Sequence, residues 1–277
     1  MSTLLKHPFA FVSLLVLTAS APAATLSLSP VADAFVTGGV TGEGADPNAG
    51  QPNLNYGAAG ALQISAAGEK EGEIQSLLQF NFASVKLTFD GQFGVGNWQV
   101  TGVTLQLGTN FGTQGTQPNN PIFNKINGGL FKIDWMENNN WGEGSGTPAL
   151  PFSPANAPVD GVTFTSLGGL LSSSDRTLGT FTYTPVGNTN PPAIPAATYN
   201  LGLDPSFVGD MLSGGLVSLR GYAADTTVSY LFNSRSYPTQ SNEPTLIIAA
   251  AAVPEPSIAV SGAIAVVLLL GRRRHRA

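Results

Sequence analysis

Apolar side chains recur at every second position in ten short segments of this chain. Each segment covers five to eight residues, and most are bounded by Gly, Pro, Asn, Asp or Ser, which favour turns. That period is typical of a β-strand with one buried and one exposed face. The ten predicted strands are residues 25–29, 61–66, 76–82, 101–107, 130–135, 161–165, 177–184, 216–222, 227–232 and 245–249.

This series predicts an all-β fold, an antiparallel β-sandwich or jelly roll, because helical segments do not alternate with the strands. One helix is expected, at residues 205–212, where Asp204 can cap the first turn and Pro205 occupies the first helical position. Several segments are expected to lack regular structure. They are the long loops 38–60, 109–128 and 138–160, a further loop at 186–197 and a spacer at 249–253.

The N-terminal end departs from the strand pattern. Lys6 precedes an apolar run, residues 9–17, and a group of small residues that includes Ala21 and Ala23. This order is typical of a helical secretory signal peptide, and the run is shorter than the about 20 residues that a spanning helix needs. We expect export by the Sec machinery and cleavage by signal peptidase after Ala23. An uncleaved membrane anchor or a buried helix is the alternative.

The C-terminal end combines a Pro-Glu-Pro motif, an uncharged apolar run and a cluster of arginines. These parts are, in order, Pro254-Glu255-Pro256, residues 257–271, and Arg272, Arg273, Arg274 and Arg276 within the basic end 272–277. As a helix, the apolar run extends about 22 Å, less than the about 30 Å hydrocarbon core of a bilayer. The arginines are expected to stay cytoplasmic, which places the body of the chain on the other side of the membrane.

This three-part end resembles the PEP-CTERM sorting signal. The resemblance implies a short C-terminal membrane helix that tethers the chain to the inner membrane. It also implies recognition by exosortase, a membrane-embedded cysteine protease that would cut near the Pro-Glu-Pro motif and pass the body to the cell surface or extracellular matrix. A permanent single-pass anchor is the alternative. The expected division is a signal peptide (1–23), a body (24–249) and a sorting tail (250–277).

Within the body, three motifs come in order. They are Ala32-Asp33-Ala34-Phe35-Val36, Asn53-Leu54-Asn55-Tyr56-Gly57 and Ser76-Leu77-Leu78-Gln79-Phe80. Together they resemble the DNRLRE-type domain, a family of extracellular β-sandwich modules, over most of residues 25–250. The resemblance implies an association with extracellular polysaccharide proteins, and some members bind carbohydrate. Gln75 stands where the family usually has an arginine, which leaves that arginine's interactions in doubt here.

Charge and residue types narrow the function of the body. Residues 24–256 contain seven basic and all seventeen acidic residues, a formal charge of −10. An acidic body without a basic cluster is a poor partner for nucleic acid, because phosphate binding needs concentrated Lys and Arg. The chain has no Cys, and His7 and His275 lie in segments expected to be removed. This excludes Ser-His-Asp triads, cysteine nucleophiles and His or Cys zinc sites from the mature body.

Few residues are candidates for ligand contacts. Trp135 alternates with Phe131 and Ile133, which predicts that it packs in the core, whereas Trp141 lies in a polar loop where it gains no obvious burial. Trp141 is therefore the ligand candidate. No cofactor is expected except, at most, a structural Ca²⁺, although the spacing of the carboxylates matches no defined calcium loop. The carboxylates that could supply its oxygen ligands are Asp33, Asp134, Glu137, Glu143 and Asp225.

The sequence predicts a non-enzymatic body, structural or polysaccharide-associating, in an exported envelope or matrix protein. Seventeen carboxylates make a chance pair easy, so no catalytic residue is assigned. The alternative is a secreted polysaccharide-degrading enzyme, a hydrolase or a lyase.

Overall fold

The computed structural model describes residues 22–39, 52–69, 71–109, 127–146, 160–185, 196–237 and 242–253. Residues 23–252 form one compact unit. The predicted signal peptide up to Ala21 and the sorting tail from Pro254 onward lie outside the described residues. No helix of the described part is both long enough and apolar enough to span a bilayer.

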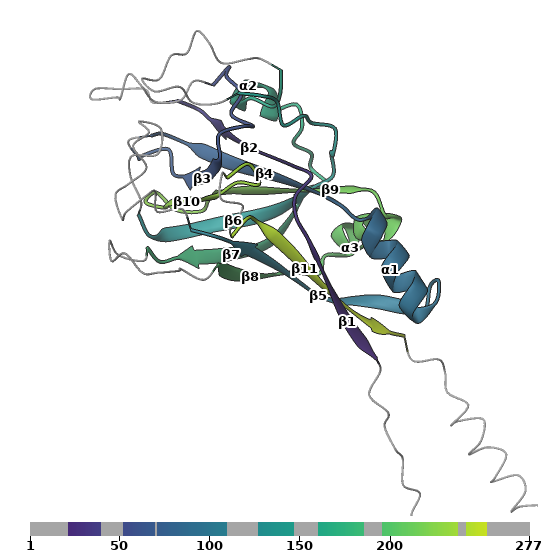
Figure 1. The fold of residues 1–277 in the computed structure, drawn as a ribbon. Coiled ribbons are helices and arrows are strands. Elements are labelled where there is room, and N and C mark those ends of the chain that lie inside the picture. Colours follow the sequence, from purple (N-terminus) through teal and green to yellow (C-terminus); the bar gives the residue numbers. More distant parts are fainter. Residues whose placement is uncertain are drawn as a thin grey trace, which may run out of the picture. The chain divides into compact units, whose positions relative to one another are not determined.

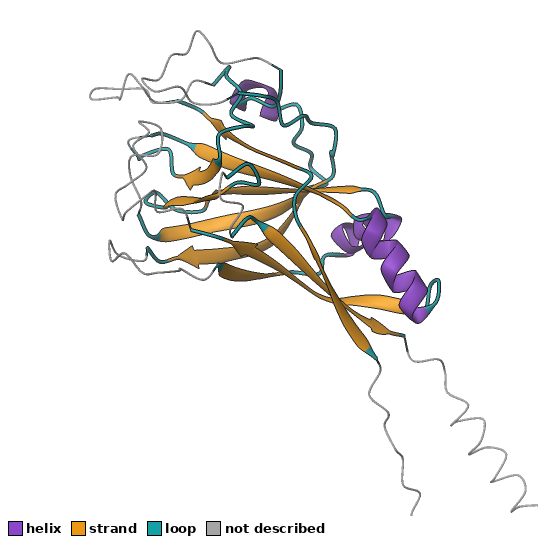
Figure 2. Ribbon diagram, in the orientation of Figure 1, coloured by secondary structure: helices purple, strands orange, loops and turns teal. Residues whose placement is uncertain are grey.

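The unit is built from two antiparallel sheets (Figures 1 and 2). Sheet A has four strands in the order β1-β11-β5-β8, and its first and last strands in sequence, β1 and β11, are neighbours. Its strands are β1 (Ala23–Leu28), β5 (Trp98–Leu107), β8 (Ala197–Leu201) and β11 (Thr245–Ala252).

Sheet B has seven strands. Six follow the order β10-β3-β4-β9-β6-β7, and β2 pairs with β4. The strands are β2 (Ala32–Thr37), β3 (Ala61–Ser65), β4 (Ile74–Asn81), β6 (Gly129–Met136), β7 (Arg176–Tyr183), β9 (Leu216–Ala223) and β10 (Ser229–Asn233).

The inner faces of both sheets contribute to one hydrophobic cluster. Leu105 and Ile248 of sheet A and Phe80, Phe131 and Tyr230 of sheet B are fully buried in it. The aromatic rings pack closely, with Tyr230 stacked on Tyr183 at 3.9 Å between ring centroids. Removing this much apolar surface from water is the main term that stabilises the fold.

Sheet B is also covered on its outer face. A second, smaller cluster contains Ala34 and Val36 of β2, Leu77 of β4 and Met136 of β6. Helix α2 (Phe164–Leu167) and the segment around Trp141 pack on it. Strands buried on both faces lose the apolar–polar alternation of a half-exposed strand. The burial patterns of β2, β3 and β10 accordingly show no alternation of buried and exposed residues.

Two further helices, α1 (Ala83–Phe93) and α3 (Pro205–Ser213), lie side by side at one end of the sheets (Figure 1). The predicted helix at 205–212 is confirmed as α3. Asp204 caps it by accepting a hydrogen bond from the backbone N–H of Ser206, and Pro205 begins it.

The all-β, antiparallel architecture is confirmed, and nine of the ten predicted segments coincide with strands. The expectation of a strand at 161–165 is wrong. The Thr163 side chain accepts a hydrogen bond from the backbone N–H of Ser166, and the Ser166 side chain accepts one from the N–H of Thr163. This reciprocal cap begins α2 instead.

Three other elements were not expected. Helix α1 buries only Val85 and Phe89, one turn apart, so it has no wide apolar stripe. Strand β2 is buried on both faces, and β8 directly follows a proline-rich stretch. The spacer expected at 249–253 is wrong, because β11 continues to Ala252 and pairs with both β1 and β5.

Candidate functional site

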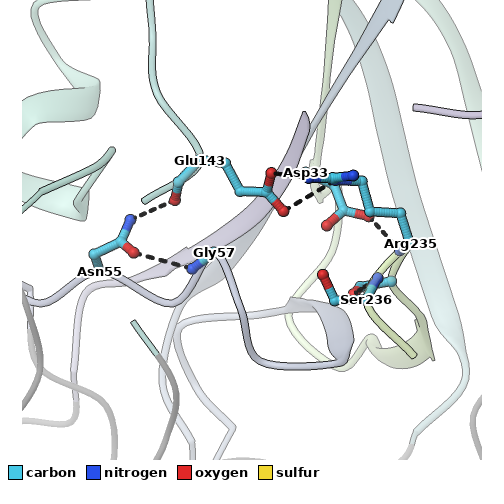
Figure 3. A network of polar contacts seen from close by, with 7 residues as sticks. Asp33, Asn55, Gly57, Glu143, Arg235 and Ser236 are labelled. Carbon is cyan, nitrogen blue, oxygen red and sulfur yellow. Dashed lines mark hydrogen bonds and ion pairs between the residues drawn. The ribbon is translucent and has the colours of Figure 1, made fainter. Parts of the chain in front are cut away.

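Asn55, in the centre of the Asn-x-Asn-Tyr-Gly motif, joins three loops (Figure 3). Its Nδ2 donates hydrogen bonds to the carbonyl oxygens of Glu143 at 2.7 Å and Val162 at 2.9 Å. Its Oδ1 accepts from the backbone N–H groups of Gly57 at 3.1 Å and Gly146 at 3.0 Å. Asn55 is fully buried, and these four bonds use the whole capacity of its amide donors and acceptor.

Tyr56 and Gly57, the last two positions of this motif, also fit the contact between the motif and the loop that contains Glu143. Tyr56 is fully buried and stacks on Phe35 of β2, with ring centroids 4.7 Å apart. A Cβ on Gly57 would lie 1.9 Å from the carbonyl oxygen of Glu143, which no side chain tolerates. The glycine therefore allows two backbones to meet where the loop crosses.

Glu143 also forms an ion pair with Arg235. The guanidinium Nη2 lies 2.6 Å from Oε2 of Glu143, and Nε donates to both carboxylate oxygens at 3.1 Å. This two-pronged geometry is the strong form of an Arg–carboxylate pair. Because Glu143 and Arg235 belong to different loops, the pair fastens the segment 142–146 to the segment that follows β10.

Asp33 of β2 lies behind this ion pair. Its Oδ2 accepts a hydrogen bond from the backbone N–H of Arg235 at 2.7 Å, and the residue is fully buried (Figure 3). Burial raises the pKa of Asp33 to about 7, although the Arg235 N–H acts in the opposite direction. The nearby carboxylates Glu143 and Glu243 add to the increase.

A second buried polar cluster lies where β3 meets β10. Ser229 and Ser65 donate hydrogen bonds from their hydroxyls to Oε1 of Glu71, and the side-chain amide of Gln63 donates to the same oxygen at 2.9 Å. Glu71 is fully buried, and burial raises the pKa of its carboxyl. These bonds link the turn before β4 to two strands.

Trp141 does not lie exposed in its loop. It is half-buried against the smaller apolar cluster on the outer face of sheet B, and its Nε1 donates a hydrogen bond to the Ser218 hydroxyl at 2.9 Å. The expectation that this position gains no burial is wrong, because the outer face of sheet B is apolar where the loop crosses it. Trp135 is a core residue as predicted, with its Nε1 bonded to Asp210 at 3.0 Å. Whether Trp141 contacts a ligand stays a prediction.

The five candidate calcium ligands lie at separate places, except that Asp33 and Glu143 share the surroundings of Arg235. Asp134 pairs with Arg220 at 3.3 Å, and Glu137 accepts a hydrogen bond from Ser172 at 2.7 Å. Asp225 accepts from the N–H groups of Leu130, Thr227 and Val228. Within the described ranges, no three Asp, Glu, His or Cys side chains converge. The calcium hypothesis stays a prediction.

Sheet A presents a surface of a different kind. Its four strands contain no Asp, Glu, Lys or Arg. The side chains that point away from the core are mostly hydroxyls, amides and small groups. They include Thr25, Ser27, Thr104, Gln106, Thr198, Asn200, Thr245, Ile247 and Ala249.

A hollow of about 370 Å³ lies at one end of this face. Gln106 and Thr245, whose Cα atoms are paired between β5 and β11, line it from the sheet. Ser29, Ala196, Asn242 and Glu243 complete the lining. The hollow is polar and shallow, so it suits a hydroxyl-bearing group better than an apolar one.

Comparison with known proteins does not identify the chain. No family model matches it, and no curated protein matches its sequence. The resemblances to the PEP-CTERM signal and the DNRLRE-type domain therefore stay predictions. Gln75, at the position of the family's arginine, donates a hydrogen bond to Glu73 at 2.6 Å.

Three polar residues central to these contacts, namely Asn55, Glu71 and Arg235, were not predicted as site residues. The sequence does contain a signal for Asn55, since an Asn two positions before a Gly favours a side-chain to backbone turn. Glu71 and Arg235 have no such local signal, because their partners are distant in the sequence.

Proposed function

We propose that this chain is an exported surface protein whose body is a non-enzymatic β-sandwich of jelly-roll type, structural or polysaccharide-associating. Delivery rests on the two end signals: Ala21 and Ala23 for signal peptidase, and the motif at Pro254 with the terminal arginines for exosortase. The body is expected to pass from the inner membrane to the cell surface or extracellular matrix.

The use of the carboxylates supports a non-enzymatic body. Most of the described carboxylates accept hydrogen bonds, or form ion pairs, that hold a loop in place or cap a helix. Besides those already named, Asp90 accepts from Trp98 and Lys86, Asp160 from Ser145, Asp175 from Ser172 and Asp210 from Trp135. Glycoside hydrolysis needs two carboxylates free to face a substrate across a cleft. Groups already engaged in the fold are poor candidates.

The outer face of sheet A is the single observation that favours polysaccharide association. An uncharged surface of hydroxyls and amides offers donors and acceptors to sugar hydroxyls without the cost of removing ions from water. The rest of the body is acidic, so it would repel an acidic chain. The favoured ligand class is therefore a neutral polysaccharide, bound along the uncharged strands β5 and β11; the hollow at Gln106, which Glu243 also lines, lies at the end of this path.

Affinity electrophoresis of the full chain in gels containing neutral polysaccharides tests this proposal. Thr104→Ala with Gln106→Ala should weaken binding about fivefold or more, because two hydrogen-bonding groups are lost. Thr180→Ala with Thr182→Ala is the matched control, since these threonines are exposed on β7 of sheet B. Absence of binding to every polysaccharide tested would refute the carbohydrate part.

Two measurements separate this proposal from its alternatives. Release of reducing ends or unsaturated uronates by the purified chain would show a polysaccharide-degrading enzyme. Intact-mass measurement of the exported protein determines the first and last residues of the mature chain. Retention of Arg272 to Arg276 would show a permanent anchor, and retention of Met1 would exclude signal peptide cleavage.

A further inference from the structure

Strand β1 forms one edge of sheet A. It pairs with β11 from Ala23 opposite Ala251 to Leu28 opposite Leu246, and β11 is its strand neighbour in the sheet. Within the described ranges, no strand pairs with the other side of β1. The backbone N–H and C=O groups on that side are therefore available to a further strand.

The edges formed by β7, β10 and β8 differ from that of β1. Strand β7 contains Arg176 and an extra residue, Leu178, that interrupts its pairing with β6. Strand β10 is buried throughout and is bridged by Thr109 and Asn127. The residue after β8, Gly202, donates a hydrogen bond to the carbonyl of Leu178, which joins the end of that strand to β7 of sheet B.

Strand β1 lacks each of these features. Its sequence, AATLSL, has no charge and no proline, and its pairing with β11 is regular over six residues. Natural proteins usually block such an edge with a charge, a bulge, a proline or a covering segment. Because no described strand pairs with this side of β1, the edge is a template for strand addition.

The side chains of β1 show that its inner face is incompletely covered. Ala24, Leu26 and Leu28 point towards the main core but are only partly buried, whereas inward residues of β11, such as Leu246 and Ile248, are fully buried. An additional strand next to β1 would cover this margin and bury more apolar surface.

We propose that β1 is the contact through which two copies of this protein associate. The two β1 strands run antiparallel, so that sheet A continues from one molecule into the other. A second copy fits because the strand is self-complementary. With Leu26 opposite Leu26 of the partner subunit, Ala24 faces Leu28 of the partner subunit on the core side, and Thr25 faces Ser27 of the partner subunit on the outer side.

Electrostatics favours contact at this edge. The body has a formal charge of −10, so two copies repel each other over most of their surface. The strands of sheet A contain no Asp, Glu, Lys or Arg, which lets the two molecules approach there. The pairing goes beyond the proposed function and does not depend on a bound polysaccharide.

Cysteine cross-linking tests the geometry, because the full chain contains no Cys. Thr25→Cys and Ser27→Cys variants, mixed and oxidised, should give a disulfide-linked dimer on a non-reducing gel. Thr198→Cys, an exposed position on the opposite edge strand β8, is the matched control and should give about tenfold less dimer. Cross-linking no stronger than this control would overturn the proposal.

Sedimentation velocity of the full chain in detergent gives an independent test. The unmodified chain should change from monomer to dimer between about 10 μM and about 1 mM, the range for a small contact. Thr25→Lys with Ser27→Lys should stay monomeric with an unchanged melting curve, because both side chains are exposed. Thr198→Lys should still dimerise.

Three results contradict the proposal. They are an unmodified chain that stays monomeric, a lysine pair on β1 that still dimerises, and equal loss of the dimer in Thr198→Lys. None of them bears on polysaccharide binding, which is measured separately.

Discussion

Sheets A and B share one core but differ in the charge of their strands and in the covering of their outer faces. Sheet B is covered on that face by α2 and the segment around Trp141, and it carries Asp33, Lys132, Asp134, Arg176 and Arg220 in its strands. The strands of sheet A contain no Asp, Glu, Lys or Arg, and their outward side chains are exposed or half-buried among the described residues. The charged groups therefore occur where loops must be fastened, and the strands of sheet A are left uncharged.

The largest expected effect concerns the covering of sheet B. Asn55→Ala removes four buried hydrogen bonds and leaves two carbonyls and two N–H groups without their partner. We expect the free energy of unfolding to fall by about 5 kcal/mol. Asn200→Ala, at an exposed position of sheet A with one bond to Thr104, should cost less than about 1 kcal/mol. Urea unfolding of both variants checks the difference, and equal losses would contradict it.

The second prediction uses the pKa of Asp33, which burial raises from 3.8 to about 7. Between pH about 4 and about 7 the folded protein holds a proton that the unfolded chain has released, so stability falls as the pH rises through this range. Three pKa units correspond to about 4 kcal/mol.

Asp33→Asn removes this titration and should flatten the pH dependence of the unfolding free energy, measured by urea unfolding at each pH. Glu71, whose pKa is also raised by burial, would leave a smaller slope of the same sign. Asp160→Asn is the control, because hydrogen bonds from Ser145 lower the pKa of Asp160 and its loss should not flatten the curve. An unchanged slope in Asp33→Asn would refute the assignment.

The third prediction compares apolar residues on the two outer faces. Leu77 of β4 is fully buried under the covering segment, so Leu77→Ala should cost about 3 kcal/mol. Ile247 of β11 is only half-buried on the open face, and Ile247→Ala should cost about 1 kcal/mol. Thermal unfolding of the two variants gives the comparison directly. A larger loss for Ile247→Ala would show that sheet A is covered after all.

The smallest effect concerns Trp141. Trp141→Phe keeps an aromatic ring against the smaller apolar cluster of sheet B but loses the hydrogen bond to Ser218. This loss should lower the free energy of unfolding by about 1 kcal/mol. Polysaccharide binding by sheet A should be unchanged in this variant. Weaker binding at unchanged stability would instead favour Trp141 as the ligand contact and move the site to sheet B.

Three strands of sheet A, namely β1, β5 and β11, could be predicted from sequence because one face is exposed, as the alternation of buried Leu246 and Ile248 with half-buried Thr245 and Ile247 shows. Strand β2 was not predicted because Ala34 and Val36 are buried on one face and Phe35 on the other. Alternation cannot mark a strand whose two faces are both apolar.

The candidate site was harder to predict than the fold. The motif around Asn55 was recognised as a resemblance, yet its partners Glu143 and Val162 are 88 and 107 residues away. Trp141 was misjudged for the same reason. The local sequence is polar, and only the fold places the apolar outer face of sheet B beneath it.

The pairing of β1 with β11 would set the order in which the body is completed if the chain is exported as proposed. A chain that crosses the membrane N-terminus first delivers β1 at once and β11 last, so β1 waits without a strand partner until nearly all of the body has crossed. Ala23, the expected cleavage position, is the first residue of that waiting strand. In the proposed export, signal peptidase would meet an extended segment, and a chain that stops short of β11 would lack the strand partner of β1.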